Sequence, residues 1–148
     1  MDNWKCLIHR SIIELDCPLL QRNYPLTYYQ QSINKMFVTE TQIRIHYALT
    51  DQMGIVYYGH YAQFYEIGRT EAIRQIGYTY KEIEAMGIIM PVVEIHSRFL
   101  RPAKYDDLIT VKTTLKEMPT HHKIVFHADI FNEQDELLNT GTVSLFFV

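Results

Sequence analysis

Thr50-Asp51-Gln52-Met53-Gly54-Ile55-Val56-Tyr57-Tyr58-Gly59-His60-Tyr61 joins two kinds of hydrophobic periodicity in this chain of 148 residues. Before it, side chains from Ile43 to Tyr47 alternate between apolar and polar, which predicts a strand. After Tyr58 the apolar residues recur with a period near 3.6, which predicts a helix. Asp51 therefore lies in a glycine-containing turn just ahead of a helix N-terminus.

This placement of Asp51 has two explanations. The free N–H groups and the positive dipole end of a helix N-terminus polarise a carbonyl oxygen. A carboxylate nearby attacks the carbonyl carbon or activates a water molecule to do so. The simpler explanation is structural, because an Asp before a glycine commonly forms an Asx-turn.

Two blocks of the sequence resemble the hydroxybenzoyl-CoA thioesterase family of hotdog-fold proteins, and within it the bacterial YbgC-like acyl-CoA thioesterases. The first block contains Asp51, Gly54, Val56, Tyr57, Tyr58, Gly59 and Tyr61, followed by Phe64-Tyr65-Glu66 and Arg69-Thr70-Glu71. The second is Arg101-Pro102-Ala103-Lys104-Tyr105-Asp106-Asp107. The resemblance runs from about Thr39 to Val148, with both blocks in the family's order.

Periodicity predicts one helix with a wide apolar stripe, surrounded by strands. The stripe consists of Tyr61, Phe64, Tyr65, Gly68, Ala72 and Ile76, and Gly77 is the expected end of the helix. A short helix is expected at 79–85, and further strands at 88–100, 108–117, 122–132 and 137–148. These elements must bury their apolar faces against each other. We therefore predict an α+β protein with a curled antiparallel five-stranded sheet wrapped around one long central helix, which is also the hotdog fold that the resemblance implies.

Composition fits one small domain with an N-terminal extension. The chain is 47% hydrophobic and 21% charged, with a net charge of −3, so we expect no nucleic-acid partner. We expect no transmembrane segment, no signal peptide and a cytoplasmic location. Residues 37–148 are predicted to form the hotdog thioesterase domain. Residues 1–36 match nothing in the family and are either a peripheral extension or a segment that packs on the domain through Trp4, Tyr28 and Tyr29.

The resemblance implies the activity and the catalytic residues. It implies hydrolysis of an acyl-CoA thioester to the free acid and coenzyme A, with no metal and no cofactor. Asp51 matches the family's catalytic carboxylate, as nucleophile or as general base. Tyr58 matches the position whose backbone N–H binds the thioester carbonyl. The expected substrate-binding residues are Gly54, Val56, Tyr57, Gly59, His60, Tyr61, Glu66, Arg101 and Lys104.

Several of these residues have competing interpretations. His60 either positions the substrate or the Asp51 loop, or forms a catalytic pair with Asp51. An ion pair with Arg69 three residues along the helix explains Glu66, which is otherwise the reserve catalytic carboxylate. Arg101 and Lys104 are candidates for the coenzyme A phosphates.

Three further groups of residues bear on the site. His121, His122 and Lys123 form a further cluster that is a candidate for the coenzyme A phosphates. The histidines on predicted strands, His46, His96 and His127, have no metal-ligand spacing. Candidates for the acyl pocket are Met53, Ile55, Val56, Tyr61 and Met90.

Two other classes of function remain as alternatives. A hydratase or dehydratase of hotdog fold resembles a different motif, with a catalytic His in an Asn-Pro context that this sequence lacks. A non-catalytic module that binds acyl-CoA or acyl carrier protein is the other alternative, and Asp51 argues against it. The resemblance further implies a homodimer or homotetramer with the active site at the subunit interface, and an exposed sheet edge favours such pairing.

Overall fold

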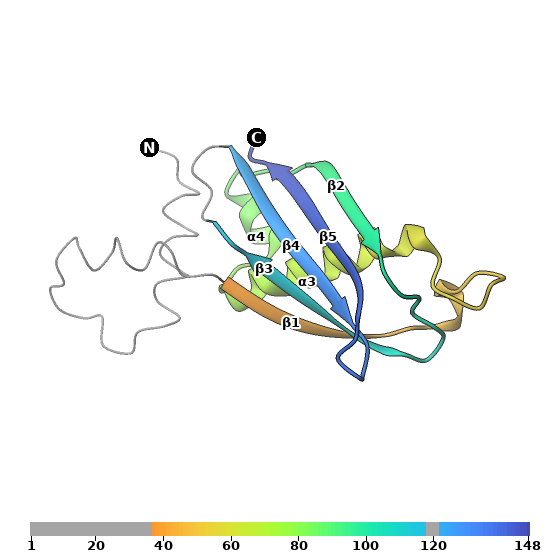
Figure 1. Ribbon diagram of the computed structural model, residues 1–148. Helices are drawn as coiled ribbons and strands as arrows, with labels where there is room; N and C mark the ends of the chain where they lie inside the picture. The colour runs from red at the N-terminus through yellow and green to blue at the C-terminus, as the bar shows by residue number, and fades with distance from the viewer. Residues whose placement is uncertain (1–36, 118–121) are drawn as a thin grey trace, which may run out of the picture.

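The computed structural model describes residues 37–117 and 122–148 (Figure 1). Its elements in chain order are β1 (Phe37–Arg44), the 3₁₀ helices η1 (Tyr47–Leu49) and η2 (Tyr58–His60), the helices α3 (Tyr61–Gln75) and α4 (Tyr80–Ala85), and the strands β2 (Val92–Phe99), β3 (Leu108–Leu115), β4 (Lys123–Phe131) and β5 (Leu137–Phe146). The expectations for residues 1–36 and for His121 lie outside the described residues.

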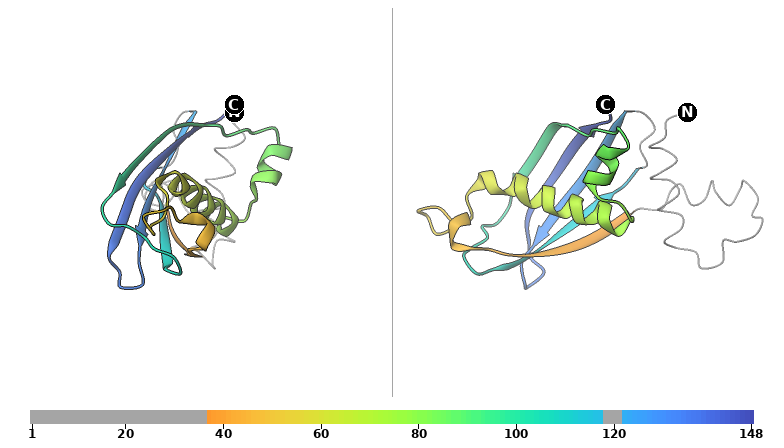
Figure 2. Two further views of the ribbon diagram at one scale, coloured as in Figure 1. Left: turned by 90° about the vertical axis from the view of Figure 1, so that its right-hand side faces the viewer. Right: turned by 180° about the vertical axis from the view of Figure 1, so that it is seen from behind.

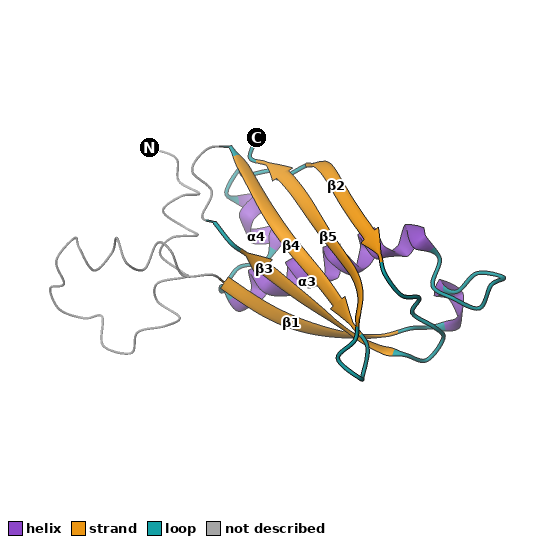
Figure 3. Ribbon diagram, in the orientation of Figure 1, coloured by secondary structure: helices purple, strands orange, loops and turns teal. Residues whose placement is uncertain are grey.

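The five strands form one antiparallel sheet in the order β1-β3-β4-β5-β2. The sheet curls, and α3 lies along its concave face (Figure 2). The colouring by element type separates the sheet, which faces the viewer, from the helix behind it (Figure 3). The arrangement confirms the predicted fold class, a curled antiparallel sheet around one long helix.

The apolar stripe of α3 packs on the sheet as its spacing predicts. Tyr61, Phe64, Tyr65, Gly68 and Ala72 are all buried, and Ile76 follows at the end of the helix. The sheet contributes fully buried aliphatic side chains to the same core, among them Ile109, Val111, Ile130, Leu138 and Leu145. The helix therefore owes its position to burial of this stripe, which removes it from water.

The short helix α4 begins with a capping box. The Thr79 hydroxyl accepts a hydrogen bond from the Glu82 N–H at 3.2 Å, and the Glu82 carboxylate accepts one from the Thr79 N–H at 2.7 Å. The hydrogen bonds from Thr79 lower the pKa of Glu82 below its ordinary value. The prediction of a short helix at 79–85 is confirmed.

The first strand differs from its prediction. It begins at Phe37 and ends at Arg44, and Tyr47 lies 79% exposed in η1 rather than on the buried face of a strand. The reason lies in the facing loop, where Asp106 adopts the left-handed conformation with φ of 69°. This turn ends the regular ladder with β3, although the Ile45 N–H still bonds to the Asp107 carbonyl at 2.9 Å.

The second strand is also shorter than its predicted range of 88–100. It begins at Val92, directly after Pro91, which has no N–H to donate to a ladder. A bulge between Val92 and Glu94 disturbs its pairing with β5. β2 has no strand on its outer side among the described residues, and all eight of its residues are exposed.

The remaining strands and the last hairpin turn agree with their predictions. Asn132 accepts hydrogen bonds at its side-chain oxygen from the N–H groups of Gln134 and Glu136, and Asp135 has φ of 57°. This arrangement closes the predicted turn between β4 and β5. Among the described residues, no helix is long and apolar enough to cross a membrane.

Candidate active site

Asp51 lies in a small hairpin that protrudes beside the N-terminal end of α3. A bridge between Thr50 and Val56 closes the hairpin. The Asp51 N–H donates to the Ile55 carbonyl at 2.9 Å, and the Gly54 N–H donates to the Asp51 carbonyl at 3.0 Å. Gly54 has φ of 74°, a conformation that favours glycine. Backbone hydrogen bonds therefore fix the position of Asp51 independently of its side chain.

The Asp51 carboxylate is half-buried and forms the Asx-turn that its sequence context predicts. Its Oδ1 atom accepts a hydrogen bond from the Met53 N–H at 2.8 Å. No other hydrogen bond joins this carboxylate to the described residues. One oxygen thus orients the carboxylate within the turn, and the second remains available for chemistry.

Two backbone N–H groups at the helix start have no acceptor among the described residues. The Tyr57 N–H donates to the Leu49 carbonyl at 3.0 Å, and the His60 N–H donates to the Tyr57 carbonyl at 3.0 Å. The N–H groups of Tyr58 and Gly59 have no acceptor in residues 37–117 or 122–148, as expected for the first residues of a helix. The Tyr58 side chain is 66% exposed.

Because Gly59 has no side chain, the Tyr57 ring packs close to its backbone. A Cβ atom at this position would lie 2.6 Å from the Tyr57 ring. The Tyr57 ring also contacts the rings of Tyr58 and His60, with centroids 4.5 Å and 5.8 Å apart. An aromatic cluster therefore covers the helix start. The reason for a glycine at position 59 follows from this packing.

His60 does not form a hydrogen bond with Asp51 in the described part of the chain. It is half-buried and packs edge-on against Tyr57. This geometry agrees with a positioning role for His60 and gives no support to a catalytic Asp51–His60 pair.

Tyr61 connects the helix start to the end of the edge strand. It is 3% exposed, and its ring meets the Phe99 ring edge-on with centroids 5.0 Å apart. Its hydroxyl group bonds to the backbone of Ala103, and burial raises the pKa of this hydroxyl. Phe99 was not predicted as a site residue, because its position beside α3 depends on the curl of the sheet.

The second sequence block packs directly against the Asp51 hairpin. The Val56 N–H donates to the Ala103 carbonyl at 2.9 Å, and Ile55 forms a bridge with Lys104. The tertiary structure therefore brings the two family-like blocks together. It also buries Val56, at 4% exposure, so this residue supports the hairpin from below.

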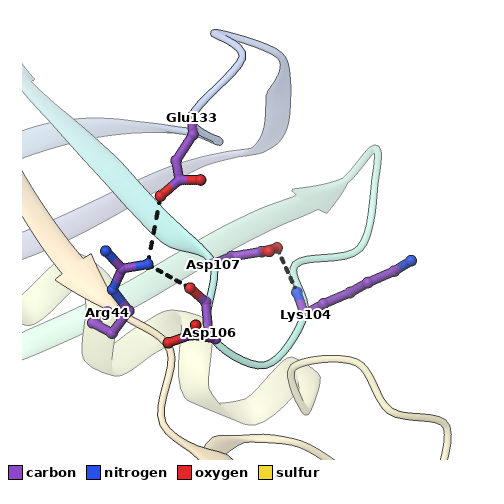
Figure 4. A network of polar contacts seen from close by, with 5 residues as sticks. All are labelled: Arg44, Lys104, Asp106, Asp107 and Glu133. Carbon is purple, nitrogen blue, oxygen red and sulfur yellow. Dashed lines mark hydrogen bonds and ion pairs between the residues drawn. The ribbon is translucent and has the colours of Figure 1, made fainter.

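The two predicted phosphate-binding residues of this block differ in their contacts. Arg101 is exposed and forms an ion pair with Glu136 at 3.9 Å. The Lys104 backbone N–H donates to the Asp107 carboxylate at 2.7 Å, and its side chain extends away from this cluster (Figure 4). Lys104 is thus the freer of the two cations.

Arg44 holds the turn that carries this block. Its Nη1 atom donates to the Asp106 carbonyl at 2.6 Å and pairs with Glu133 at 3.4 Å (Figure 4). This clamp could not be predicted from the sequence, because its three members come from β1, the loop before β3 and the β4–β5 turn.

Glu66 does not have the partner that its spacing predicted. The prediction of an ion pair with Arg69 is wrong for the described residues, because the Arg69 side chain turns toward α4. Its Nε atom donates to the Tyr80 hydroxyl at 2.8 Å, and the residue is 8% exposed. Glu66 is exposed on the outer side of α3.

A partly buried ring of three hydrogen bonds, which was not predicted from the sequence, lies one helical turn beyond Tyr61. The Tyr65 hydroxyl bonds to Ser97 at 2.6 Å and donates to the Asn139 side-chain oxygen. The Asn139 amide donates to Ser97 at 3.0 Å, which closes a three-membered ring of hydrogen bonds. Burial raises the pKa of the Tyr65 hydroxyl, so this hydroxyl group keeps its proton.

Met90, a candidate for the acyl pocket, lies away from this end of the molecule. It lines a cavity of about 30 Å³ together with Ile73, Ile76, Tyr78, Ile83, Leu115, Ile124 and Phe126, at the C-terminal end of α3. The helix separates this cavity from the Asp51 hairpin. Met53, another pocket candidate, is 79% exposed at the hairpin tip. Within the described ranges, no three His, Cys, Asp or Glu side chains lie close enough together to hold a metal ion.

Comparisons with known proteins agree with this architecture. A family model described as the thioesterase superfamily matches residues 53–139. The chain is 36% identical to a putative acyl-CoA thioesterase, YneP, of Bacillus subtilis, over 74% of this chain and 78% of that protein. It is 31% identical to the acyl-CoA thioester hydrolase YbgC of Escherichia coli, over 68% of this chain and 75% of that protein.

A solved structure extends the agreement from sequence to fold. The structure of a DHNA-CoA thioesterase from Staphylococcus aureus superimposes with a TM-score of 0.72 and 33% identity, over 75% of this chain and 74% of that one. The match therefore includes the sheet and the long helix.

Proposed function

Because the chain belongs to the thioesterase superfamily, we propose that it hydrolyses an acyl-CoA thioester to the free acid and coenzyme A. The observation that carries the proposal is the placement of the half-buried Asp51 carboxylate in a hairpin directly ahead of two unpaired backbone N–H groups, those of Tyr58 and Gly59. A carboxylate can supply or activate the nucleophile, and an oxyanion site stabilises the charge that develops on the carbonyl oxygen, so together the two provide for thioester hydrolysis.

The helix start stabilises the negative charge that develops during the reaction. The thioester carbonyl oxygen lies against the N–H groups of Tyr58 and Gly59, where the dipole of α3 adds to their effect. A single well-placed donor of this kind is worth about 3–4 kcal/mol of transition-state stabilisation. The role belongs to the backbone, which is why the exposed Tyr58 ring is compatible with it.

Asp51 supplies the nucleophile by one of two routes. In the first, a carboxylate oxygen attacks the carbonyl carbon, the C–S bond breaks, and water then hydrolyses the resulting anhydride. In the second, Asp51 takes a proton from a water molecule whose oxygen attacks the same carbon. In both routes the thiolate of coenzyme A leaves with the electron pair of the C–S bond.

The remaining site residues bind the substrate in this proposal. The acyl group lies beside Tyr57, Tyr61 and Phe99, and Gly54 and Val56 shape the hairpin beneath it. His60 orients the aromatic cluster, and Glu66 borders the site from α3. Lys104 and Arg101 face the phosphates of coenzyme A.

We further propose that residues 37–148 form the functional domain, that it works in the cytoplasm, and that it acts as a homodimer or homotetramer. The exposed edge strand β2 supports the association. An acyl carrier protein is a second possible donor of the acyl group.

The decisive experiment is a hydrolysis assay across a panel of acyl-CoAs. Free thiol is measured for short aliphatic, long aliphatic and aromatic acyl groups, the last because a similar structure is named for DHNA-CoA. We expect turnover well above the uncatalysed rate with at least one class. Tight binding of an acyl-CoA with no turnover of any would instead favour a non-catalytic acyl-CoA binding module.

A further inference from the structure

Arg69 is a buried charged residue that the proposed reaction does not use. It lies on α3 about two helical turns beyond Tyr61, or about 12 Å along the helix axis. It is 8% exposed, and it is the one charged residue among the buried side chains of the described ranges. Arginine is rarely buried in proteins unless its charge is paired. The partner of this charge is therefore the question that Arg69 raises.

The Arg69 guanidinium makes one hydrogen bond and no ion pair with the described residues. Its Nε atom donates to the Tyr80 hydroxyl at 2.8 Å, and its Cζ atom lies 5.8 Å from the centre of the Tyr80 ring. A guanidinium group carries five N–H donors. The other four, on Nη1 and Nη2, have no acceptor in residues 37–117 or 122–148.

The unpaired end of the guanidinium is not sealed inside the core. The fully buried side-chain atoms that lack a hydrogen bond in the described ranges are the hydroxyl oxygens of Thr39 and Thr113. The Nη1 and Nη2 atoms of Arg69 are not among them, so both reach the surface. A small molecule therefore has access to these donors.

Tyr80 adds a further donor beside the guanidinium. Its oxygen accepts the bond from Arg69, and its own proton has no acceptor among the residues that the structure describes. Burial raises the pKa of the Tyr80 hydroxyl, although the charge of Arg69 lowers it, so the hydroxyl keeps its proton at neutral pH. The two side chains together offer donors that match the acceptor oxygens of an anion.

The acidic residues of α3 do not neutralise Arg69. Glu66, three residues earlier, influences Tyr80 through its charge but forms no ion pair with Arg69 within the described ranges. Glu71 pairs with Arg74 at 3.3 Å. A buried charge without a partner is strongly destabilising. The acceptor for Arg69 is therefore expected from outside the described residues.

We propose that Arg69 and Tyr80 form a binding site for a small-molecule carboxylate. Its two oxygens accept hydrogen bonds from Nη1 and Nη2 of Arg69, and one of them also accepts the Tyr80 hydroxyl. Paired N–H···O bonds are the usual way in which arginine binds a carboxylate. Neither residue takes part in the proposed hydrolysis, so this site is separate from the one at Asp51.

Charge favours a carboxylate over a phosphate at this place. The single charge of one guanidinium balances the single charge of one carboxylate. A phosphate dianion would keep an unbalanced negative charge close to Glu66, and like charges repel. The planar shape of a carboxylate also matches the planar fork of the guanidinium.

Two sources supply a carboxylate of this kind. One is a simple carboxylate in solution, for which acetate is the probe. The other is the free acid that the proposed hydrolysis releases, for which butyrate is the probe. The second source rests on the proposed function.

Acetate titration of the full chain at constant ionic strength tests the site. We expect saturable binding in calorimetry and a shift of the Arg69 Nε–H signal in nuclear magnetic resonance spectra. Arg69→Lys removes the fork and should weaken acetate binding at least about tenfold. Tyr80→Phe removes one donor and should weaken it about threefold. Arg74→Lys, the matched change at an exposed arginine of the same helix, should have no effect.

Other outcomes of the titration overturn the proposal. Unchanged acetate affinity in Arg69→Lys, or an equal loss in Arg74→Lys, would do so. Tighter binding of sulfate than of acetate would replace the carboxylate by a tetrahedral anion. A parent that binds no acetate, but whose self-association weakens in Arg69→Lys, would assign the guanidinium to a second copy of the chain.

Tyr80→Phe keeps the test decisive if Arg69→Lys does not fold. Unchanged acetate affinity in Tyr80→Phe, together with an unshifted Arg69 signal in the parent, would then refute the site. Butyrate bound at least about tenfold more tightly than acetate would identify the product acid, and equal affinities would identify the carboxylate group alone. These titrations contain no acyl-CoA, so absence of thioester hydrolysis would refute the proposed function and leave the carboxylate site standing.

Discussion

Asp51 has a structural role in the hairpin and, in the proposed function, a chemical role as well. Its Oδ1 atom holds the hairpin turn through the Met53 N–H, so the structural explanation of this residue is correct. That same bond directs the carboxylate, and precise direction is what a catalytic group needs. The two interpretations of Asp51 are therefore compatible, and substitution separates them.

Asp51→Asn retains an oxygen for the Met53 N–H and removes the charge. We expect kcat to fall at least about 100-fold with a KM close to that of the parent, because only the reacting group is lost. Glu66→Gln serves as the matched control and should change kcat by less than about threefold, since Glu66 is exposed and has no ion pair with Arg69 in the described residues. The measurement is steady-state release of free thiol.

The opposite pattern would relocate the catalytic carboxylate. An inactive Glu66→Gln together with a normal Asp51→Asn would assign catalysis to the helix. Full turnover by both variants would show that neither carboxylate reacts.

At the scale of elements, the hydrogen bonds among Tyr65, Ser97 and Asn139 connect one helix with two strands. It connects α3 to β5 through Asn139 and to the edge strand β2 through Ser97. Tyr65 reaches both strands because it passes over Gly141, where any Cβ atom would overlap its ring. The position of β2 beside the helix start therefore depends on this ring of hydrogen bonds.

Tyr65→Phe should lower the free energy of unfolding by about 1–3 kcal/mol, because it leaves the fully buried Asn139 without its donor. The measurement is denaturant unfolding followed by circular dichroism. Tyr105→Phe removes a hydroxyl group from a residue that is 58% exposed, and should change stability by no more than about 0.5 kcal/mol. Equal stabilities of the two variants would show that the ring contributes nothing.

At the scale of the whole molecule, the described helix and strands bury each other's apolar faces in one core. The apolar stripe of α3 is covered by strands that all lie within residues 37–148. The candidate site, in contrast, is assembled from separate parts: the Asp51 hairpin, the helix start and the end of β2. The domain boundary near residue 36 is therefore a prediction about stability, and truncation tests it.

A chain shortened to begin at Met36 should unfold at the same denaturant concentration as the full chain and hydrolyse acyl-CoA at the same rate. The reason is that the helix and the sheet bury each other without help from outside the domain. Circular dichroism and the thiol assay provide the measurements. Aggregation of the shortened chain would show instead that Trp4, Tyr28 or Tyr29 covers apolar surface of the domain.

The sequence by itself determined the fold class and the local setting of Asp51. Hydrophobic periodicity is a local property, so the stripe from Tyr61 to Ile76 and the alternation of the later strands were readable without a structure. Turn chemistry is local as well, which explains why the Asx-turn at Asp51 was predictable. The family resemblance supplied the thioesterase assignment, and the comparisons confirm the family.

Only the tertiary structure decided which distant residues meet. Phe99 against Tyr61, the Tyr65–Ser97–Asn139 ring, the Arg44 clamp and the turning of Arg69 toward Tyr80 all join residues from different elements. Such contacts depend on the order and curl of the strands, which periodicity does not specify, since a period of two is the same for an edge strand and a central one. For that reason only the strand order showed that β2 lies at an edge of the sheet.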